Sequence, residues 1–425
     1  MRTVSVLGST GSIGRSTVDL LGQFPGRYAV AALVGGRNAA TLAEQAVALR
    51  ARRAVLADEA ALPELRERLA GTGIAVAAGR EAVCEAAAEP VDWCMAAIIG
   101  AAGLEPTLAA IRNGRTVALA NKEAIICAGE VMLRAVRDAG ATLLPVDSEH
   151  NAIFQAMAGA AVRGGVERIT LTASGGPFRD SSLAEMERAG PEAALKHPVW
   201  SMGAKISIDS ATMFNKGLEV IEAARLFELP EDRIDVLVHP QSTVHGMVHY
   251  ADGSILAQLG APDMRIPIAH ALGWPERLGT TSPRLDLAAL ARLDFAAPDP
   301  DRFPSLELAR AALRAGGAAS AVLSAANEVA VEHFLGRRIG FRDIARLVEA
   351  VTAELGAPPA NSIDAVLAAD AEARRRAEAW VAGRERRGSG ADGAPDAARE
   401  AARDAVPDAT MVAADGATPQ VIRAA

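Results

Sequence analysis

Short apolar runs alternate with helix-like stretches over the first 147 residues of the chain. Each run is apolar at successive positions, which is typical of parallel strands that are buried on both faces. The stretches between the runs are rich in Ala, Leu, Glu and Arg, as at 39–50 and 62–69. This alternation predicts an α/β domain in which helices cover both faces of a parallel sheet. The expected strands are 4–7, 29–34, 54–56, 74–77, 92–99, 116–120 and 142–146.

The pattern beyond residue 147 mixes strands and helices in a less regular order. A strand is expected at 166–174, and an Asp252-Gly253 turn between 244–250 and 254–260 predicts a β-hairpin. We therefore expect a second α/β domain with a mixed sheet. Its other expected elements are a strand at 234–238, helices at 183–189 and 211–227, and an irregular segment at 197–207.

The last third of the chain is helical and then changes in composition. The pattern at 305–380 is almost entirely helical, with a helix N-cap at Asn361 or Ser362. After about residue 383 the chain is rich in Ala, Gly, Asp and Pro and has no aromatic residue, so it buries too little apolar surface to fold. The sequence therefore predicts four parts: a parallel-sheet domain at 1–147, a mixed α/β domain at 148–290, a helical domain at 291–383 and a disordered tail at 384–425.

Composition and charge narrow the class of protein. Half of the 425 residues are apolar, which is enough for substantial cores, and the formal net charge of −8 lacks the basic excess that nucleic-acid binding requires. No apolar run reaches the roughly 18 residues of a membrane span, and the N-terminus lacks the apolar core of a signal peptide. Cys84, Cys94 and Cys127 are too unevenly spaced for a disulfide framework or a thiolate metal site. We expect a soluble, cytoplasmic protein that binds neither nucleic acid nor a membrane.

Lysine is rare in this chain and confined to one window. Lys and Arg together total 44, but lysine occurs only at 122, 196, 205 and 216. A compact ammonium group can donate hydrogen bonds and carry protons in ways that a guanidinium group cannot. The window therefore indicates a site that uses lysines, with chance clustering as the alternative.

A glycine-rich loop, GSTGSIG at 8–14, joins the first expected strand to the first helix. Glycines allow a tight turn, and the N-terminus of the helix offers unpaired N–H groups to a pyrophosphate, so the loop predicts a Rossmann-like dinucleotide site. The spacing GxxGxxG departs from GxGxxG, and a ligand-free turn is the alternative. The second strand ends with Arg37 and Asn38 and no acidic residue, which favours NADPH over NADH. A solvated arginine at a helix start is the alternative for Arg37.

Acidic residues at two places in the chain suggest a metal site. Asp147 and Glu149 follow the last strand of the first domain and, in an extended chain, would point the same way about 6.5 Å apart. Lys216 and Glu219 share one face of an expected helix, so that the lysine could hold a phosphate and the glutamate could complete an oxygen-ligand set. Three carboxylates suit Mg²⁺ or Mn²⁺ and not zinc. The alternatives are surface charge for the DxE pair and an exposed ion pair on the helix.

Several single residues admit two interpretations. Lys122 ends another strand, where it could move protons or polarise a carbonyl, or it could be solvated beside a helix-capping Asn121. His245 and His249 lie roughly 13 Å apart on one strand face, too far for one ion. His150 points away from Glu149 in an extended chain and is not expected to be a ligand. Ser174 has no patterned base and fits a phosphate or hydroxyl contact better than a nucleophile.

Six motifs together resemble the 1-deoxy-D-xylulose 5-phosphate reductoisomerase family. The resemblance runs in chain order from residue 1 to about 383, and the long block at 197–223 is highly specific. The motifs are GSTGSIG at 8–14, LANKE at 119–123, PVDSEHNAIFQ at 145–155, LTASGGPF at 171–178, HPVWSMGAKISIDSATMFNKGLEVIEA at 197–223 and HPQSTVHGMV at 239–248.

The resemblance implies a homodimeric enzyme of the non-mevalonate isoprenoid pathway that depends on NADPH and a divalent metal. The metal would be Mg²⁺ or Mn²⁺, with Co²⁺ as a further alternative. The enzyme would rearrange 1-deoxy-D-xylulose 5-phosphate and reduce the aldehyde to 2-C-methyl-D-erythritol 4-phosphate. Residues 1–147 would bind NADPH, residues 148–290 would bind metal and substrate, and a lid would lie at about 197–207.

The same resemblance assigns site residues one by one, and none departs from the family pattern. The implied NADPH contacts are Thr10, Gly11, Ser12, Ile13, Gly36, Arg37, Asn38, Asn121, Glu123 and Gly203. The implied metal ligands are Asp147, Glu149 and Glu219, which with Lys122 form the catalytic set. The implied substrate contacts are Lys122, Ser148, Glu149, Ser174, His197, Trp200, Met202, Ser210, Asn215, Lys216 and Glu219, of which Trp200 and Met202 belong to the lid.

Two other functions remain open at this point. A simple NADP-dependent dehydrogenase of a phosphorylated or carboxylated metabolite would transfer hydride without rearranging the carbon chain. A nucleotide-sensing regulator would bind NADPH without turnover, and the complete set of acidic residues and lysines argues against it.

Overall fold

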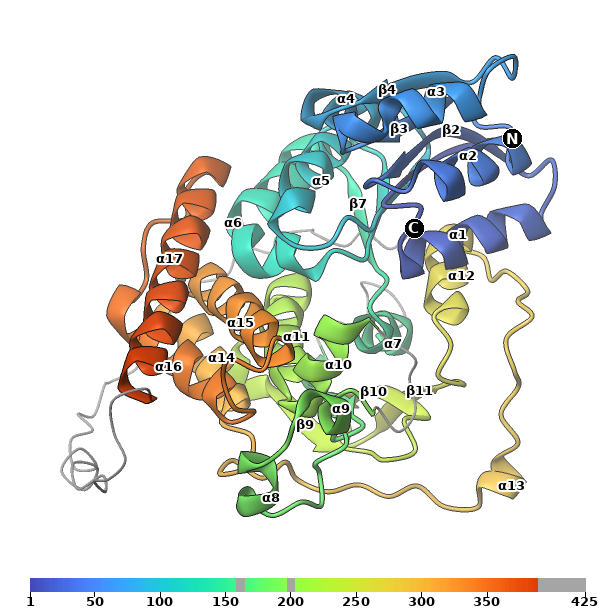
Figure 1. The fold of residues 1–425 in the computed structure, drawn as a ribbon. Helices are drawn as coiled ribbons and strands as arrows, with labels where there is room; N and C mark the ends of the chain where they lie inside the picture. Colours follow the sequence, from blue (N-terminus) through green and yellow to red (C-terminus); the bar gives the residue numbers. More distant parts are fainter. Residues whose placement is uncertain (158–164, 197–202, 389–425) are drawn as a thin grey trace.

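The computed structural model describes residues 1–157, 165–196 and 203–388. Its N-terminal part is a seven-stranded sheet in the order β4-β3-β2-β1-β5-β6-β7 (Figure 1). Every neighbouring pair is parallel, so all seven predicted strands and the predicted sheet type are confirmed. The strands are β1 Arg2–Leu7, β2 Tyr28–Gly35, β3 Arg53–Leu56, β4 Ala75–Ala78, β5 Trp93–Ala96, β6 Thr116–Leu119 and β7 Thr142–Pro145.

Alternate residues of these strands enter two separate apolar clusters, one on each face of the sheet. In β1, for example, Val4 and Val6 lie in one cluster and Leu7 in the other. The first cluster is covered by α1 Ser12–Gln23, α2 Ala39–Ala48 and α3 Leu62–Arg68, and the second by α4 Arg80–Ala88, α5 Leu104–Ile111 and α6 Lys122–Ala139. Short 3₁₀ turns occur at Glu59–Ala61, Ala101–Gly103 and Glu231–Arg233.

One helix of the predicted second domain packs on this first sheet. The helix α12, Arg265–Gly273, lies beside α1 (Figure 1) and contributes Ile268 and Leu272 to the first apolar cluster. The indole Nε1 of Trp93 in β5 donates a 2.9 Å hydrogen bond to the carbonyl of Ala271. The chain therefore returns to its N-terminal sheet after completing the second one.

The second sheet has four strands in the order β11-β10-β8-β9. The pair β8 and β9 is parallel, whereas β10 is antiparallel to both β8 and β11, so the predicted mixed sheet and hairpin are confirmed. The helix α7, Ser148–Ala156, packs against β10 and β11. The strands are β8 Val166–Ala173, β9 Ile234–Val238, β10 Val244–Tyr250 and β11 Ile255–Leu259.

The helices around this sheet differ from the prediction at two places. Residues 197–202 of the expected irregular segment 197–207 lie outside the described residues. Residues 204–207 of that segment belong to the helix α10, Ala204–Ala211. The expected helix 211–227 is broken, because Met213 has a left-handed backbone (φ 59°) and α11 starts anew as Phe214–Phe227. The short helices α8 Leu183–Glu187 and α9 Pro191–Ala194 complete this part.

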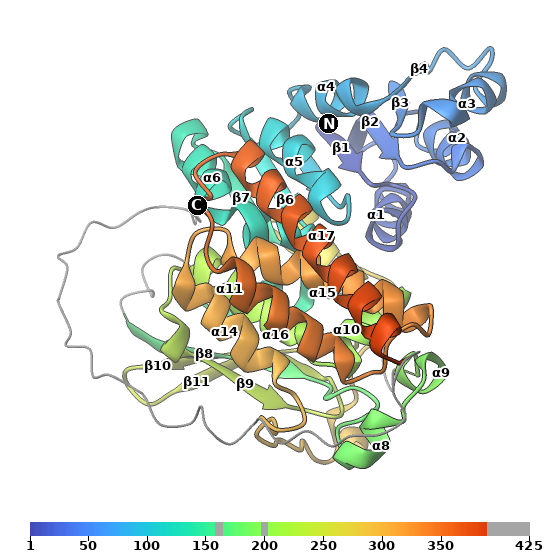
Figure 2. The ribbon, with the colours of Figure 1, turned by 60° about the vertical axis from the view of Figure 1, so that its left-hand side comes forward.

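The C-terminal part is helical, as predicted. It comprises α14 Ser305–Ala315, α15 Ala319–Leu335, α16 Asp343–Leu355 and α17 Ile363–Gly388, and the short helix α13 Leu287–Leu290 precedes it. Figure 2 shows α17 running along α15, with its first turns beside α6. One apolar cluster joins α14, α15, α16 and α17 to α11 and to the second face of the parallel sheet. None of the described helices is both long and apolar enough to cross a membrane.

The last helix extends further than the sequence indicated. Ser362 is its cap, since its hydroxyl accepts a hydrogen bond from the backbone N–H of Ala365. Residues 384–388, which we expected in the tail, are helical because Arg384 pairs with Asp343 and Glu385 pairs with Arg338. The rest of the predicted tail lies outside the described residues.

The contact between α11 and α14 depends on a glycine and gives a first prediction. A Cβ at Gly217 would lie 2.8 Å from the Cβ of Ala309 and 3.0 Å from the carbonyl oxygen of Ser305. Gly217→Ala should therefore lower the free energy of unfolding by about 1–3 kcal/mol, as overpacking does, in a denaturant titration. The control is Gly22→Ala in α1, where an added Cβ meets nothing within 4 Å. The control should be neutral or stabilising, and equal effects of the two changes would contradict this account of the packing.

Candidate active site

A cavity of about 420 Å³ lies where the parallel sheet meets the second domain. Its walls come from the start of α1, the chain following β6 and β7, the end of β8, and the helices α10 and α11. Residues far apart in the sequence thus face one space. The predicted site residues that line it are Ser12, Ile13, Lys122, Asp147, Ser148, Glu149, Ser174, Gly203, Ser210, Asn215, Lys216 and Glu219.

The two carboxylates after β7 converge by a different route from the one predicted. The strand ends at Pro145, Asp147 is the N-cap of α7, and Glu149 lies in the first turn of that helix. The chain is therefore not extended at Glu149, and the two side chains meet through a helical turn. The hydroxyl of Ser148 donates a 2.6 Å hydrogen bond to Glu149, which also benefits from its place at a helix N-terminus.

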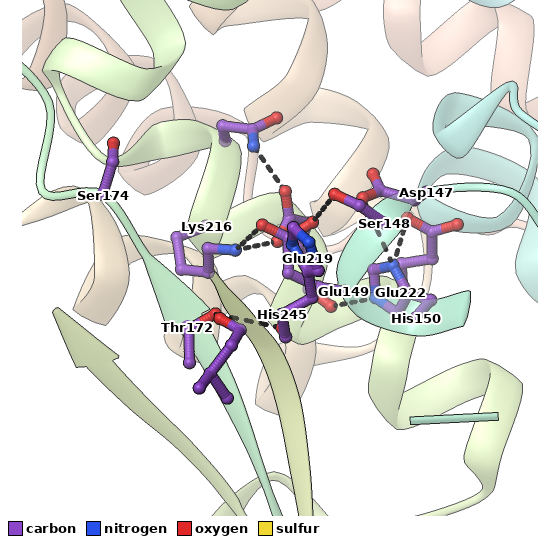
Figure 3. Close-up of polar contacts among 12 residues, drawn as sticks. Asp147, Ser148, Glu149, His150, Thr172, Ser174, Lys216, Glu219, Glu222 and His245 are labelled. Atoms are coloured by element: carbon purple, nitrogen blue, oxygen red, sulfur yellow. Dashed lines mark hydrogen bonds and ion pairs between the residues drawn. The ribbon is translucent and has the colours of Figure 1, made fainter. Parts of the chain in front are cut away.

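Two lysines connect these carboxylates to α11. The ammonium of Lys122 lies 2.7 Å from Asp147 Oδ2 and 3.4 Å from Glu219 Oε1. The ammonium of Lys216 lies 2.8 Å from Glu149 Oε1 and also contacts Glu219 (Figure 3). The alternative interpretation of this pair as an exposed ion pair on α11 is wrong, because the side chains of both Lys216 and Glu219 are buried.

The amide of Asn215 completes this network. Its oxygen accepts a 2.9 Å hydrogen bond from Lys122, and its nitrogen donates to Glu219. Lys122 is therefore held by three groups and is not the solvated lysine of the alternative interpretation. Asn121 does cap α6, as that alternative supposed, by accepting a hydrogen bond from the N–H of Ala124.

The three predicted metal ligands fit a divalent cation. Asp147, Glu149 and Glu219 each offer a carboxylate oxygen, and these oxygens all lie within 4.8 Å of one another. Burial and the neighbouring charge of Glu149 raise the pKa of Glu219 to about 8. Burial alone would raise the pKa of Asp147, but Lys122 and His150 hold it below its usual range. An ionised Glu219 is therefore unfavourable in this network alone, and a hard cation among the oxygens would relieve its repulsion.

His150 and Glu222 belong to the same buried network, although the sequence did not point to them. The Nε2 atom of His150 lies 3.0 Å from the carbonyl oxygen of Glu219, and its Nδ1 atom lies 3.5 Å from Glu222 Oε2 (Figure 3). With Asp147 they form a second group whose ligand atoms lie within 4.8 Å of one another. His150 follows Asp147 by three residues, and Glu222 follows Glu219 by three residues, which is the spacing of one helix face. This spacing was the available signal for the second group. We missed it because we expected an extended chain at 147–150.

The glycine loop has the geometry of a nucleotide-binding turn. Gly8 has a φ of 89°, and a Cβ there would lie 2.4 Å from the carbonyl oxygen of Ala97. A Cβ on Gly14 would lie 2.2 Å from the carbonyl oxygen of Gly8, so both positions need glycine. Gly11, the N-cap of α1, has no side chain to occupy the first N–H groups of the helix, which leaves them available to a phosphate.

The other expected cofactor residues lie at the ends of neighbouring elements. Gly36 and Arg37 are exposed beyond the end of β2, and the side chain of Asn38 caps α2 by accepting from Thr41. Glu123 is buried in the first turn of α6, and Gly203 is the N-cap of α10 and lines the cavity. His197, Trp200 and Met202 lie outside the described residues.

Several residues of the cavity wall were not predicted. They include His245, which we had weighed only as a metal partner of His249. His249 instead bonds to the hydroxyl of Thr170, 2.8 Å away, and does not line the cavity. Most of the remaining unpredicted wall residues lie within the quoted family motifs, namely Ala120, Val146, Thr172, Ala173, Gly175, Ile206, Met213 and Ser242. Ser16, Pro262, Asp263 and Met264 lie outside those motifs.

Comparison with known proteins matches one enzyme family over most of the chain. The family model described as 1-deoxy-D-xylulose 5-phosphate reductoisomerase matches residues 4–129, and two models for C-terminal domains of that enzyme match 143–227 and 259–376. The 1-deoxy-D-xylulose 5-phosphate reductoisomerase of Gluconobacter oxydans is 64% identical over 381 residues, which cover 89% of this chain and 93% of that relative.

Two solved structures are also similar. The 1-deoxy-D-xylulose 5-phosphate reductoisomerase of Zymomonas mobilis in complex with NADPH is 54% identical, with a TM-score of 0.85 over 89% of this chain and 99% of that one. A reductoisomerase in complex with NADPH, fosmidomycin and magnesium is 42% identical, with a TM-score of 0.86 over 91% of this chain and 99% of that one. With a relative this close matched over nearly its whole length, and with the predicted acidic and lysine set assembled in one cavity, the chain belongs to the 1-deoxy-D-xylulose 5-phosphate reductoisomerase family.

Proposed function

We propose that this cavity rearranges the carbon skeleton of 1-deoxy-D-xylulose 5-phosphate and reduces the resulting aldehyde to 2-C-methyl-D-erythritol 4-phosphate. The rearrangement breaks one C–C bond and forms another without net oxidation, and the reduction adds a hydride to carbon and a proton to oxygen. The observation that carries the proposal is the meeting of three carboxylates and two lysines beside the glycine loop. In this role the chain is an NADP-dependent oxidoreductase of the non-mevalonate isoprenoid pathway.

The metal site would consist of Asp147, Glu149 and Glu219. Their oxygen donors suit Mg²⁺ or Mn²⁺, with Co²⁺ as a further alternative. A divalent cation bound there supplies positive charge to the oxygen atoms of the substrate that become negative during rearrangement. The similar reductoisomerase structure in complex with magnesium and NADPH supports this assignment.

Lys122 would act as a proton and hydrogen-bond donor to those substrate oxygens. Burial lowers the pKa of its ammonium group, but Asp147 and Glu219 raise it well above the ordinary value. The amine therefore stays protonated in this network, which favours stabilisation of an oxyanion over removal of a proton. Its position on the first turn of α6 places it beside the chain that follows β6, where the sheet offers its ligand-binding edge.

The phosphate of the substrate would be held by small polar groups and a lysine, Ser174, Ser210, Asn215 and Lys216. These residues line the cavity from the chain after β8 and from α10 and α11, and Ser148, a further expected contact, also lines it. His197, also an expected contact, lies outside the described residues. Lys216 now contacts two carboxylates. It can turn to a phosphate once a cation neutralises those carboxylates, so metal and substrate binding would support each other.

The NADPH site would begin at the glycine loop and include Arg37. An arginine and no acid at the end of β2 suits the 2′-phosphate of NADPH. Ser12 and Ile13 belong to the loop and also line the cavity, so a nicotinamide bound there would lie near Lys122. The similar structure from Zymomonas mobilis in complex with NADPH supports this cofactor.

Loss of one metal ligand tests the proposal directly. Glu219→Gln should lower kcat/KM by about 10²–10³-fold, because it removes charge that holds the cation. It should also weaken Mn²⁺ binding measured by calorimetry. The control is Glu231→Gln, a carboxylate outside the cavity that pairs with Arg310 and Arg314. Near-normal Mn²⁺ binding and turnover in Glu219→Gln would refute its assignment as a ligand.

The raised pKa of Glu219 predicts how pH affects the metal-free protein. Its pKa of about 8 exceeds the value near 4.5 of an unfolded chain, so the folded state binds more protons between these values. In excess chelator, this group should therefore reduce Tm progressively as pH rises from about 4.5 to about 8. Glu219→Gln should flatten that slope when Tm is measured by calorimetry. An identical slope in wild type and variant would contradict the assigned charge repulsion.

We also propose that the protein is a cytoplasmic homodimer. Cys84, Cys94 and Cys127 are free thiols, which suits a reducing compartment. The strand β11 is an edge strand whose Ile255 and Leu256 are 53% and 47% exposed, so both of its faces present apolar side chains. Such an edge is a site where a second chain can bury apolar surface.

A charged side chain introduced on the edge strand β11 should dissociate the proposed dimer. Leu256→Asp would bury an unpaired carboxylate in the proposed interface and should weaken dimerisation by at least about 100-fold, as seen by light scattering after gel filtration. The control is Leu183→Asp, which changes an exposed leucine of α8. A Leu256→Asp protein that stays dimeric at low concentration would place the interface elsewhere, and a monomeric wild type would reject the dimer.

A further inference from the structure

The helix α6 has a break that a distant arginine fills. Ala128 has φ −119° and ψ 28°, which lie outside the helical range. The guanidinium of Arg225, on α11, donates hydrogen bonds to the carbonyl oxygens of Ile125 and Ile126 just before the break. In a regular helix these carbonyls accept from the N–H groups of residues 129 and 130, so the side chain stands in for bonds that the break weakens.

The surroundings of this guanidinium are unusual for an arginine. Among the residues that the structure describes, no carboxylate forms an ion pair with Arg225, whose remaining contact is a 3.3 Å hydrogen bond to the hydroxyl of Ser320 in α15. The approach also requires Gly129, because a Cβ there would lie 2.5 Å from Cδ of Arg225. One side chain thus links α6, α11 and α15, which come from the three predicted domains (Figure 1).

The two helices joined by this arginine also meet at the active site. Lys122, at the start of α6, lies 2.9 Å from Asn215 and 3.4 Å from Glu219 on α11. Arg225 follows Glu219 by six residues, about 9 Å along the helix axis. The two helices therefore touch at two levels, and the arginine contact at one level constrains the lysine contact at the other.

We propose that Arg225 is a positioning residue for the reaction, which sets the place of Lys122 relative to Glu219 by holding the break in α6. The inference rests on the proposed function for its kinetic test and on the contacts above for its structural one. A shift of about 1 Å in a catalytic group can cost roughly 100-fold in rate, so a loss of this constraint would fall mainly on kcat. Two of the proposed phosphate contacts, Ser174 and Ser210, lie on neither α6 nor α11, so the KM for the phosphosugar should change less than kcat.

The first test compares Arg225→Met with Arg310→Met. Arg310 likewise donates to two backbone carbonyls, those of Glu231 and Ile234, but lies outside the cavity wall. In Arg225→Met, kcat should fall about 10- to 100-fold and KM should change less than about threefold. In Arg310→Met, Tm should fall without a change in kcat. An unchanged kcat in folded Arg225→Met would show a merely structural arginine and overturn the inference.

The second test changes Gly129, so that the inference stays testable if Arg225→Met does not fold. Gly129→Ala retains the charge and improves helix propensity, but displaces the arginine stem. Its kcat should fall about tenfold, and its crystal structure should show a longer distance between Lys122 Nζ and Glu219 Oε1 than the 3.4 Å seen here. An unchanged distance would overturn the inference about Arg225, and this result does not depend on turnover by the wild type. A wild type that does not turn over the phosphosugar would reject only the proposed function.

Discussion

The buried excess of carboxylate charge at the junction of α7 and α11 is the constraint on which the site depends. Asp147, Glu149, Glu219 and Glu222 meet there, and two lysines, Lys122 and Lys216, oppose their charge. Buried charges are stable only when they are paired and hydrogen-bonded, and at Glu219 burial and the charge of Glu149 outweigh the two lysines and raise the pKa to about 8. A bound divalent cation would neutralise this charge. The carboxylates that repel one another in the metal-free site would therefore make the site specific for such a cation.

The rest of the fold serves to bring these charges together. The parallel sheet directs the ends of β6 and β7, and with them Lys122 and Asp147, towards one edge. The left-handed turn at Met213 starts α11 at the angle that directs Glu219 towards that edge. The packing of α14 against Gly217 and the arginine link to α6 then hold α11 in place. Loss of any one of these contacts would displace a charged side chain of the site but would leave its charge unchanged.

Much of the fold followed from the sequence because its signals are local. The seven strands of the first sheet are short apolar runs, and the Asp252-Gly253 turn defined the hairpin of the second sheet. The window of lysines also proved informative, since Lys122 and Lys216 are in the network and Lys205 pairs with Asp209, although Lys196 is exposed. Individual site residues came from the family motifs, and the cavity brings most of them together.

The features that the sequence did not reveal depend on contacts between distant segments. The return of α12 to the first sheet rests on Trp93 and Ala271, which are 178 positions apart. The place of His150 follows from a helix start at Ser148, where the DxE spacing had suggested an extended chain. The link from Arg225 to Ile125 and Ile126 spans about a hundred residues and leaves no periodic pattern.

The most direct measurement of the central claim is the anomalous scattering of Mn²⁺ in crystals of the full chain grown with NADPH. The account predicts one strong peak, about 2.1 Å from an oxygen of each of Asp147, Glu149 and Glu219. A peak at the neighbouring group of Asp147, His150 and Glu222, or no peak near Glu219, would contradict it.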